Sequence, residues 1–326
     1  MRILKTKSEL NEIKKDCVLT IGNFDGVHIG HQAILTTAKR AASKRKAQLV
    51  VMTFNPHPLS ILFPEKNPGI LTPLLLKKHL LTGFGVDYLF IVKTTRRLLN
   101  LSPPDFVHKF LVEHIQPSVV VEGESFNFGL DRTGNIHTLR RFSNNNGFKL
   151  IVVGAKKIRL SSGKLLKVSS TVIRNLLATS NVADAVIALG RPYRLIGKIV
   201  PGRGKGRKLG FPTANMKLPS QLIPAEGVYA GFVEVADTFN QLLSAQRKIP
   251  AAFSIGRPSV YGDKPPLLIE AHLLTNNVGR LYDKWLAMDF IRRIRSQKKF
   301  RTDSALSVQI AQDCKQAKKI LSGDRM

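Results

Sequence analysis

The sequence has little of what marks secreted, membrane or metal-binding proteins. It contains two cysteines, Cys17 and Cys314, which lie far apart and form no CxxC or other metal-ligand spacing, so neither a disulfide framework nor a zinc site is expected. No apolar run approaches the roughly 18 residues that cross a bilayer. Residues 1–16 hold five lysines or arginines and no apolar core, unlike a signal peptide. These absences favour a cytoplasmic protein with two buried or inert thiols.

Acidic and aromatic residues are also scarce. The chain has 22 Asp and Glu against 51 Lys and Arg, a formal net charge of +29, and 7% aromatic residues. Such a charge is typical of nucleic-acid or anionic-surface binding. However, the basic clusters are spread along the chain, without an RNA- or DNA-reading motif or a run of aromatics for stacking. We expect mostly solvated charge, small molecules as partners, no membrane, and nonspecific nucleic-acid binding at most. The oligomeric state is left open.

An apolar content of 43% over 326 residues indicates a globular chain of two domains. Up to about residue 185, apolar runs alternate with helical patterns. The expected strands are 18–21, 48–54, 87–92, 118–122 and 149–153, and the expected helices are 29–42, 73–82, 104–113 and 136–145. Apolar strands separated by helices predict an α/β fold with a parallel sheet covered on both faces. Ligands bind such sheets beyond the carboxyl ends of the strands.

Beyond about residue 190 the pattern changes to short strand-like segments separated by Gly and Pro turns. These segments are 193–200, 228–235, 249–255, 267–274 and 285–291. Their spacing predicts an antiparallel barrel or sandwich. A last helix follows, with Leu306, Ile310, Ala317 and Leu321 on one face. We place the domain junction within 184–193, which gives domains of 1–185 and 186–326.

The segment Gly22–His31, which directly follows the first apolar run, reads GNFDGVHIGH. His28 and His31 are three residues apart at the opening of the predicted helix, so both side chains lie on one face, beside free N–H groups and a partial positive charge. Gly22 and Gly30 let the backbone approach a phosphate. The segment resembles the HxGH signature of nucleotidyltransferases. The alternative is a pair of histidines that only satisfy the start of the helix.

A second glycine-rich segment, Gly202–Asn215, reads GRGKGRKLGFPTAN. A loop of backbone N–H groups with basic side chains suits a polyphosphate, but the Walker A order is absent, and a flexible basic turn is an alternative. Thr213 and Asn215, two residues apart, lie on the same side of an extended segment. Their hydroxyl and amide oxygens suit Mg²⁺ beside nucleotide phosphates.

With these motifs in view, the chain resembles the bifunctional riboflavin kinase/FAD synthetase family of bacteria along essentially its whole length. The matching motifs occur in the family's order. They are 22–32 (GNFDGVHIGHQ), 53–58 (TFNPHP), 123–134 (GESFNFGLDRTG), 169–174 (SSTVIR), 189–193 (LGRPY), 206–215 (GRKLGFPTAN), 227–229 (GVY), 254–258 (SIGRP), 269–274 (IEAHLL) and 281–282 (LY). The resemblance implies a Rossmann-like nucleotidyltransferase domain followed by an antiparallel β-barrel riboflavin kinase domain with a terminal helix.

For the first domain, the resemblance implies transfer of AMP from ATP to FMN, giving FAD and pyrophosphate. His28 and His31 would hold the triphosphate, and Asn23 and Asp25 would shape their loop, although Asp25 is alternatively a turn residue. His57 would face the cleft, or alternatively stabilise a turn between two prolines. The further phosphate-binding residues implied are Ser169, Ser170, Thr171 and Arg174, which alternatively form a plain helix cap. The flavin-binding residues implied are Phe126 and Phe128.

For the second domain, the resemblance implies phosphorylation of riboflavin to FMN by ATP. Glu270 would be the general base, or alternatively an exterior residue of the barrel. Thr213 and Asn215 would coordinate Mg²⁺, and Arg295 would touch flavin or lie on the surface. The residues implied to cover the phosphates are Gly202, Gly206 and Arg207.

Several positions depart from the family's usual residues without removing a primary catalytic group. Ser125 stands where Asp or Asn is more frequent, and Arg203 and Gly204 replace Asp and Lys. Thr275 stands for Asp, and Gln297 for Glu. One alternative is therefore a chain with reduced kinase activity. Two others are a basic nucleic-acid-binding protein on an enzyme scaffold, and a nucleotidyltransferase for a different nucleotide or acceptor.

Overall fold

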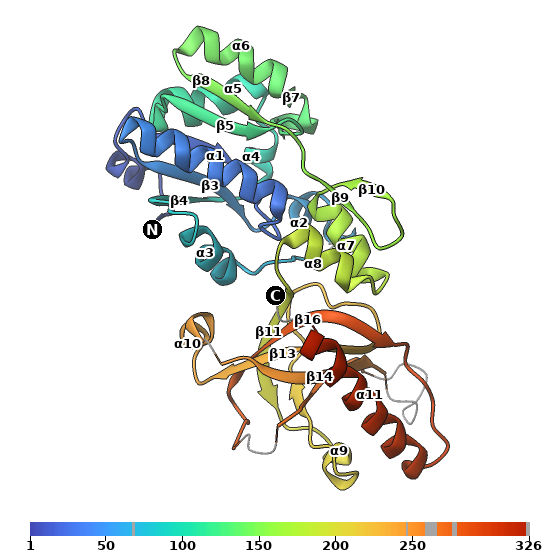
Figure 1. Cartoon of the computed structure of the whole chain (residues 1–326). Helices are drawn as coiled ribbons and strands as arrows, with labels where there is room; N and C mark the ends of the chain where they lie inside the picture. The colour runs from blue at the N-terminus through green and yellow to red at the C-terminus, as the bar shows by residue number, and fades with distance from the viewer. Residues whose placement is uncertain (67–68, 246, 258–265, 276–278, 324–326) are drawn as a thin grey trace. The chain divides into compact units, whose positions relative to one another are not determined.

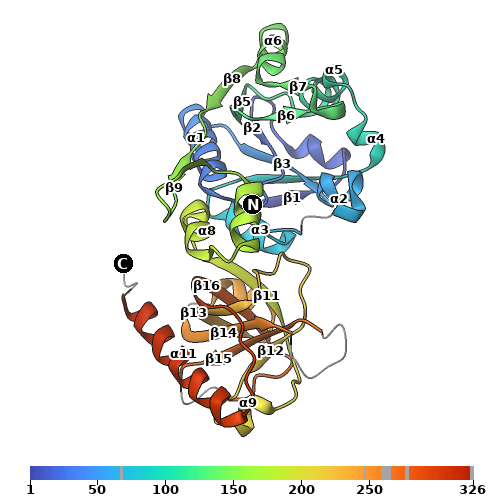
Figure 2. The same cartoon turned by 90° about the vertical axis from the view of Figure 1, so that its right-hand side faces the viewer.

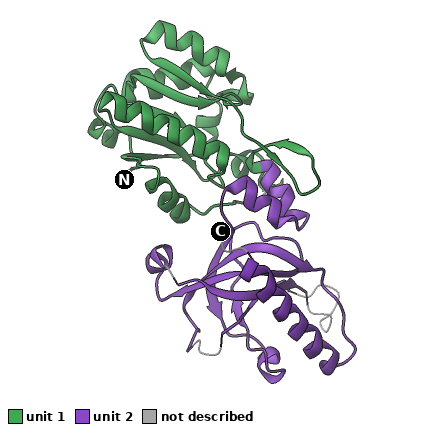
Figure 3. Ribbon diagram, in the orientation of Figure 1, with its two compact units in different colours: residues 1–170 green, residues 171–326 purple. Residues whose placement is uncertain are grey.

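The computed structural model describes residues 1–66, 69–245, 247–257, 266–275 and 279–323. The chain divides into two compact units, Met1–Ser170 and Thr171–Met326 (Figure 3). The predicted domain boundary after residue 185 falls inside a helix of the second unit. Pro258, the last residue of the 254–258 motif, lies outside the described residues. Within the described ranges, no helix is both long enough and apolar enough to cross a membrane.

The first unit is built around parallel strands joined by helices (Figure 1). Its elements are β1 (Arg2–Leu4), η1 (Ser8–Glu12), β2 (Val18–Ile21), α1 (Ile29–Arg45), β3 (Leu49–Asn55), α2 (Pro58–Leu62), η2 (Pro64–Lys66), α3 (Leu74–Thr82), β4 (Tyr88–Lys93), α4 (Arg96–Leu99), α5 (Pro103–Val107), η3 (His108–Ile115), β5 (Val119–Gly123), β6 (Asn127–Phe128), η4 (Leu130–Arg132), β7 (Gly134–Asn135), α6 (Ile136–Asn146), β8 (Lys149–Val153), β9 (Lys157–Arg159) and β10 (Leu165–Lys167). The α/β prediction is confirmed.

The main sheet has six strands in the order β1-β4-β3-β2-β5-β8. From β2, the chain adds β3 and β4 on one side and later adds β5 and β8 on the other. The strand order therefore reverses between β2 and β5. In sheets of this kind, the crevice at the reversal point, beyond the carboxyl ends of the strands, is the usual ligand site. The segment Gly22–His31 leaves the sheet at this point.

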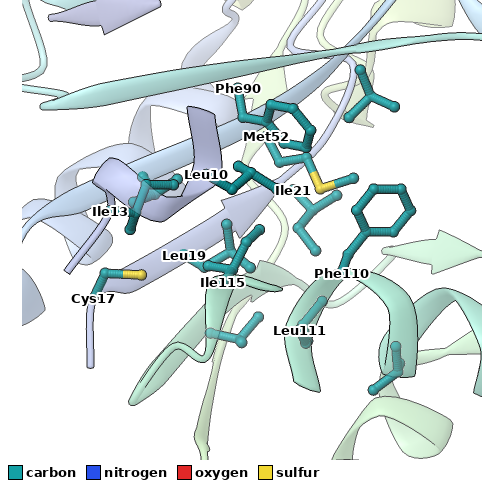
Figure 4. Close-up of a cluster of buried hydrophobic side chains, with 14 of the residues drawn as sticks. Leu10, Ile13, Cys17, Leu19, Ile21, Met52, Phe90, Phe110, Leu111 and Ile115 are labelled. Carbon is teal, nitrogen blue, oxygen red and sulfur yellow. The ribbon is translucent and has the colours of Figure 1, made fainter. Parts of the chain in front are cut away.

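Helices cover both faces of this sheet (Figures 1 and 2), and an apolar core lies on each face. On one face, α1 and α3 pack through residues such as Leu35 and Leu81. On the other face, Leu19, Ile21 and Met52 pack against α5, η3 and α6. Figure 4 shows these three side chains with Phe110, Leu111 and Ile115 of η3. Burial on both faces explains why the strands read as continuous apolar runs. The helix predicted at 104–113 is instead a short α-helix, α5, which continues as the π-helix η3.

The second unit begins with two helices and continues as a closed antiparallel barrel. Its elements are α7 (Ser170–Ala178), α8 (Val182–Leu189), β11 (Tyr193–Val200), α9 (Lys205–Lys208), β12 (Ala214–Met216), β13 (Gly227–Ala236), α10 (Phe239–Ser244), β14 (Ile249–Gly256), β15 (Leu268–Leu273), β16 (Trp285–Arg295) and α11 (Asp303–Gly323). The barrel order is β11-β12-β15-β14-β13-β16. Of the two architectures left open by the sequence, the barrel is therefore the one that forms.

Side-chain alternation separates the inside of the barrel from its outside. The rings of Tyr229 and Phe253 pack against Phe290 inside it, with centroids 5.3 and 4.9 Å away. Outside it, α11 packs through Cys314, Ala317 and Leu321 against β13 and β14. The predicted last helix is confirmed. The strand β12 is not predicted, because three residues within a Gly- and Pro-rich segment give no recognisable alternation.

Candidate functional site

The two histidines of the first motif lie together at the start of α1. His28 is the N-cap residue, and its Nδ1 accepts a hydrogen bond from the backbone N–H of His31 at 3.3 Å. The two rings are stacked, with centroids 3.6 Å apart and planes 16° apart. Because Nδ1 of His28 is an acceptor, its hydrogen is on Nε2, which is then a donor. His28 therefore does cap the start of α1, as the alternative reading of the motif expected, and its Nε2–H can still donate to a ligand.

The glycines beside these histidines are closely packed and leave little room for a side chain. A Cβ added to Gly30 would lie 3.1 Å from two atoms of the His28 ring, and one added to Gly22 would lie 3.2 Å from the Phe24 ring. The ring of Phe24 in turn lies against His31, with centroids 5.2 Å apart. Small residues therefore keep the His28–His31 pair in place as well as leaving the backbone accessible.

Asp25 shapes the loop, as one of its two predicted roles requires. Its buried carboxylate accepts hydrogen bonds from the backbone N–H groups of Leu71 and Thr72 at 3.0–3.1 Å. The Thr72 hydroxyl in turn accepts the N–H of Gly26 at 3.0 Å. The carboxylate therefore holds the segment before α3 against the loop Gly22–His31. Its oxygens accept hydrogen bonds from protein N–H groups.

Lys77 is a residue of this site that the sequence analysis missed. It is on α3 and is buried, with its Nζ donating to the Asn23 carbonyl at 2.7 Å. Burial lowers the pKa of Lys77, while the charge of Asp25 raises it. The amide oxygen Oδ1 of Asn23 is also buried, and it accepts no hydrogen bond from the parts of the chain that the structure describes. Such an atom is what a ligand-facing acceptor requires.

His57 has a local structural role, and its predicted place facing the cleft stays a prediction. It is the N-cap residue of α2, and its Nδ1 accepts the N–H of Leu59 at 3.1 Å. The peptide bond between Asn55 and Pro56 just before it is cis. His57 follows β3, the sheet neighbour of β2, so it lies at the same edge of the sheet as Gly22–His31, as predicted.

The serine-rich motif at 169–174 also reaches the loop of the first motif. The Ser170 hydroxyl donates to the carbonyl of Asp25 at 2.8 Å, which joins two motifs that are 145 residues apart. Ser169 and Ser170 are half-buried, Thr171 is exposed, and Arg174 is buried on α7. The structure thus brings Ser170 together with the HxGH loop inside the first unit.

The two phenylalanines proposed from the sequence to bind flavin differ in accessibility. Their rings stack with centroids 5.4 Å apart. Phe128 is buried in the core and also contacts Phe106, whereas Phe126 is half-buried at the edge of that core. Ser125, the departure just before them, is exposed. Phe128 therefore supports the position of Phe126, whose ring is the more accessible one.

In the second unit, the candidate residues form a polar row across three strands. The register pairs Asn215 of β12 with Glu270 of β15, and Glu270 with Ser254 of β14. Ile269 and Ala271, which flank Glu270, are buried inside the barrel, so Glu270 faces its exterior. The alternative expectation, that the Glu270 side chain points to the outside of the barrel, is correct about its direction. Ser254 begins the 254–258 motif, but its place beside Glu270 follows only from the strand register.

Glu270 is held in this row by its neighbours. Its Oε1 accepts a hydrogen bond from the Thr213 hydroxyl at 3.3 Å. Burial raises the pKa of Glu270 above its usual range, and the Thr213 hydrogen bond and the charge of Arg203 lower it in part. An exterior carboxylate in full solvent would show no such effect of burial.

The glycine-rich loop lies directly over Thr213 and Asn215. A Cβ added to Gly202 would lie 2.2 Å from Nδ2 of Asn215, and one added to Gly206 would lie 2.4 Å from the Phe211 carbonyl and 3.3 Å from the Thr213 hydroxyl. Only glycine fits at these two positions. The predicted loop is not wholly irregular, because Lys205–Lys208 form one helical turn, α9, in which Lys205 pairs with Asp303 at 2.9 Å. Arg207 is exposed on that turn.

Arg295 is not a surface residue. Its Nε and Nη2 bind the two carboxylate oxygens of Asp313 on α11 at 2.8 and 2.7 Å. The side chains of the pair are 14% and 6% exposed. The guanidinium therefore fastens α11 to the end of β16, and no sequence pattern predicts this partner 18 residues away.

Gln297 joins the polar row from the far side of β14. Its Nε2 donates to the Ser254 hydroxyl at 3.0 Å and to the Ile255 carbonyl at 2.9 Å. A glutamate, the family's frequent residue here, has no donor when ionised. The departure at 297 is therefore accommodated by contacts that need an amide.

Comparison with known proteins gives a family match for each of the two parts of the chain. Residues 10–171 match the FAD synthetase family, and residues 189–321 match the riboflavin kinase family. Among curated relatives, the bifunctional riboflavin kinase/FMN adenylyltransferases of Escherichia coli K12 and Pseudomonas fluorescens are each 35% identical and aligned over 96% of both chains. The protein of the same name from Buchnera aphidicola of Schizaphis graminum is 31% identical over 98% of both chains.

A solved structure shares the fold over nearly the whole chain. It is described as a macrolide-efflux protein from Streptococcus pneumoniae, is 27% identical, and covers 96% of this chain and 97% of its own with a TM-score of 0.81. The family matches and the full-length relatives give one consistent assignment. The chain belongs to the bifunctional riboflavin kinase/FMN adenylyltransferase family, with its FAD synthetase domain first and its riboflavin kinase domain second.

Proposed function

We propose that the second unit phosphorylates riboflavin with ATP, and that the first unit transfers AMP from a second ATP to the resulting FMN to form FAD. The observation that carries the kinase half is the position of Glu270, half-buried beside the Thr213 hydroxyl and under a loop that only glycine can form. The stacked His28–His31 pair at the start of α1 carries the transferase half. We place the border between the two domains within 172–188, the interval between the two family matches.

In the kinase reaction, Glu270 is the general base. Its carboxylate takes the proton of the terminal ribityl hydroxyl while that oxygen forms a bond to the γ-phosphorus of ATP. The bond from the γ-phosphorus to the bridging oxygen breaks, and ADP leaves. Because burial raises the pKa of Glu270, its ionised form is a stronger base than a solvent-exposed glutamate.

Thr213 and Asn215 fit the role of Mg²⁺ ligands. A hydroxyl and an amide oxygen are ligands of the hard type that Mg²⁺ prefers, and the backbone of Gly202 packs closely against the Asn215 amide. When bound, the ion supplies positive charge beside the phosphates. The loop from Gly202 to Arg207 covers the same phosphates and contributes basic side chains.

In the transferase reaction, an oxygen of the FMN phosphate attacks the α-phosphorus of ATP, and pyrophosphate leaves. We propose that the Nε2–H of His28 donates to the triphosphate, and the proposal is supported by the acceptor role of its Nδ1 and by the stacking of His31 beside it. The buried Oδ1 of Asn23 is placed to accept a hydrogen bond from a ligand donor. We propose that Ser169, Ser170, Thr171 and Arg174 complete the phosphate site, and that Phe126 contacts the flavin.

An incubation with riboflavin, ATP and Mg²⁺, followed over time by separation of FMN and FAD, tests both activities. FMN first and FAD later would support the proposal. FAD from added FMN, but nothing from riboflavin, would show that the departures at Arg203, Thr275 and Gln297 disable the kinase. Turnover of neither flavin would refute the enzymatic proposal.

Two substitutions assign the activities to the two units, and each serves as the control of the other. Glu270→Gln removes the base but keeps the shape, so FMN formation is expected to fall by roughly 10²-fold or more while FMN adenylylation is unchanged. His31→Ala is expected to do the reverse. Loss of both activities in either variant would contradict separate sites.

A further inference from the structure

A buried carboxylic acid lies at the reversal point of the main sheet. Glu122 is the penultimate residue of β5 and follows three consecutive valines. Its side chain is 2% exposed. A further valine would satisfy the strand pattern at this position, so the polar group needs a specific explanation.

The backbone pairing around Glu122 shows what its carboxyl group does. The pairing of β2 with β5 ends at Leu19 and Val120, whereas the pairing of β2 with β3 continues to Ile21 and Met52. The strands β2 and β5 therefore part before either of them ends. This parting opens the sheet at the place where two site loops begin.

The N–H of Ile21 would have no strand partner on this side. Val18 and Gly22 both donate to carbonyls next to or in β3, those of Gln48 and Met52, at 2.9 and 3.0 Å. Because successive N–H groups of a strand alternate in direction, the N–H of Ile21 points toward β5. Oε1 of Glu122 accepts it at 2.6 Å. The side chain thus bridges the gap between the parted strands.

This hydrogen bond connects the origins of two loops that the proposed function uses. Ile21 immediately precedes Gly22–His31, which holds the histidine pair. Glu122 immediately precedes the segment 123–134, which holds Phe126 and Phe128. The Ile21–Glu122 contact therefore fixes the separation between the triphosphate side and the flavin side of the proposed transferase site.

The environment favours the uncharged form of the carboxyl group. Burial raises the pKa of Glu122 well above its usual range, and the hydrogen bond from Ile21 opposes this only in part. An acceptor oxygen, and not a negative charge, is what the Ile21 N–H needs. An amide of the same length offers that oxygen.

We infer that Glu122 is a positioning residue for FMN adenylylation, which sets the spacing of the two site loops by accepting the Ile21 N–H across the parted strands β2 and β5. This inference rests on the transferase half of the proposed function. Glu122 touches neither reacting phosphate in this scheme, and it acts through the loops that begin at Ile21 and Gly123.

Three substitutions at position 122 distinguish the effect of side-chain length from the effect of charge. Glu122→Gln keeps the length and the acceptor, Glu122→Asp keeps the carboxyl group but is one methylene shorter, and Glu122→Val removes the polar group. We expect kcat/KM for FMN adenylylation to stay within about threefold of wild type for Glu122→Gln. It should fall roughly 10- to 100-fold for Glu122→Asp and Glu122→Val, since small misplacements of reacting groups cost that much. Riboflavin phosphorylation, measured on the same samples, should be unchanged.

Each outcome decides a different point. Equal adenylylation by wild type and all three variants would overturn the inference alone. Activity in Glu122→Asp combined with loss in Glu122→Gln would also overturn it, because charge would then matter more than reach. If Glu122→Val loses both activities through misfolding, the Gln and Asp pair still gives the answer. A wild-type protein that makes no FAD from FMN would overturn the proposed function, and this inference with it.

Discussion

The ion pair between Arg295 and Asp313 permits a quantitative test of what fastens the last helix. Among the described residues, Asp313→Ala leaves the Arg295 guanidinium with a hydrogen bond from Nη1 to the Ser296 carbonyl at 2.9 Å and a cation–π contact with the Phe300 ring. Removing one partner of a buried pair costs about 3–5 kcal/mol. Because Arg295 is still 14% exposed, we expect the lower end, about 3 kcal/mol. Replacing both partners by apolar residues, as in Arg295→Met with Asp313→Leu, should recover most of this loss.

The chain contains a single tryptophan, Trp285, on β16 of the barrel. Its fluorescence during urea unfolding therefore reports the second unit. With a denaturant dependence of about 2 kcal/mol per molar, a loss of 3 kcal/mol lowers the midpoint by roughly 1.5 M. The double variant should unfold near the wild-type midpoint and should keep the KM for riboflavin within about twofold.

Two results would refute this reasoning. A midpoint for Asp313→Ala that matches wild type would show that the pair does not fasten α11. A double variant of wild-type stability with a KM for riboflavin raised tenfold or more would show that Arg295 contacts the flavin, the role suggested by sequence resemblance, and not only Asp313.

Two further predictions concern the kinase site. The charge of Arg203 lowers the pKa of Glu270, so Arg203→Ala raises that pKa. Since Glu270 must be ionised to accept a proton, the acidic limb of the kcat/KM profile for riboflavin should move to higher pH, while Arg203→Lys should leave it in place; a shift to lower pH would contradict the assignment. Gly202→Ala would put a Cβ 2.2 Å from Nδ2 of Asn215, so riboflavin phosphorylation should fall at least about tenfold with FMN adenylylation unchanged. Gly323→Ala, which meets no atom within 4 Å, is its control, and equal kinase rates in the two variants would rule out the steric argument.

The strands of the first unit were predictable because parallel strands buried on both faces are continuously apolar. The strand 18–21 agrees with β2 to the residue. His28 and His31 were recognisable because their contact is local, within one helical turn. The motifs of both domains, and their order, were also recognisable, since a sequence motif can be identified without knowing which residues are in contact.

The rest depends on contacts between distant residues. Ser254 joins Glu270 only through the register of β14 and β15, and Asp313 joins Arg295 only when α11 docks. Lys77 occurs in a helical pattern where a lysine usually faces solvent, yet it is buried against the Asn23 carbonyl. Glu122 reads as the polar end of a strand. A signal was available for these two residues, since each directly follows an apolar run, 74–76 for Lys77 and 119–121 for Glu122.

The close packing of the glycine-rich loop divides its positions into two kinds. At 202 and 206 the backbone occupies space that any side chain would need, so the path of the loop allows no variation there. At 203, 205 and 207 the side chains are exposed, and their identity can change without moving the backbone. The electrostatic field over the proposed phosphate site can therefore be retuned, by natural variation or by design, independently of the backbone path of the loop. The arginine at 203 is one instance of this freedom, and these three positions are where the charge of the loop can be changed with the least risk to folding.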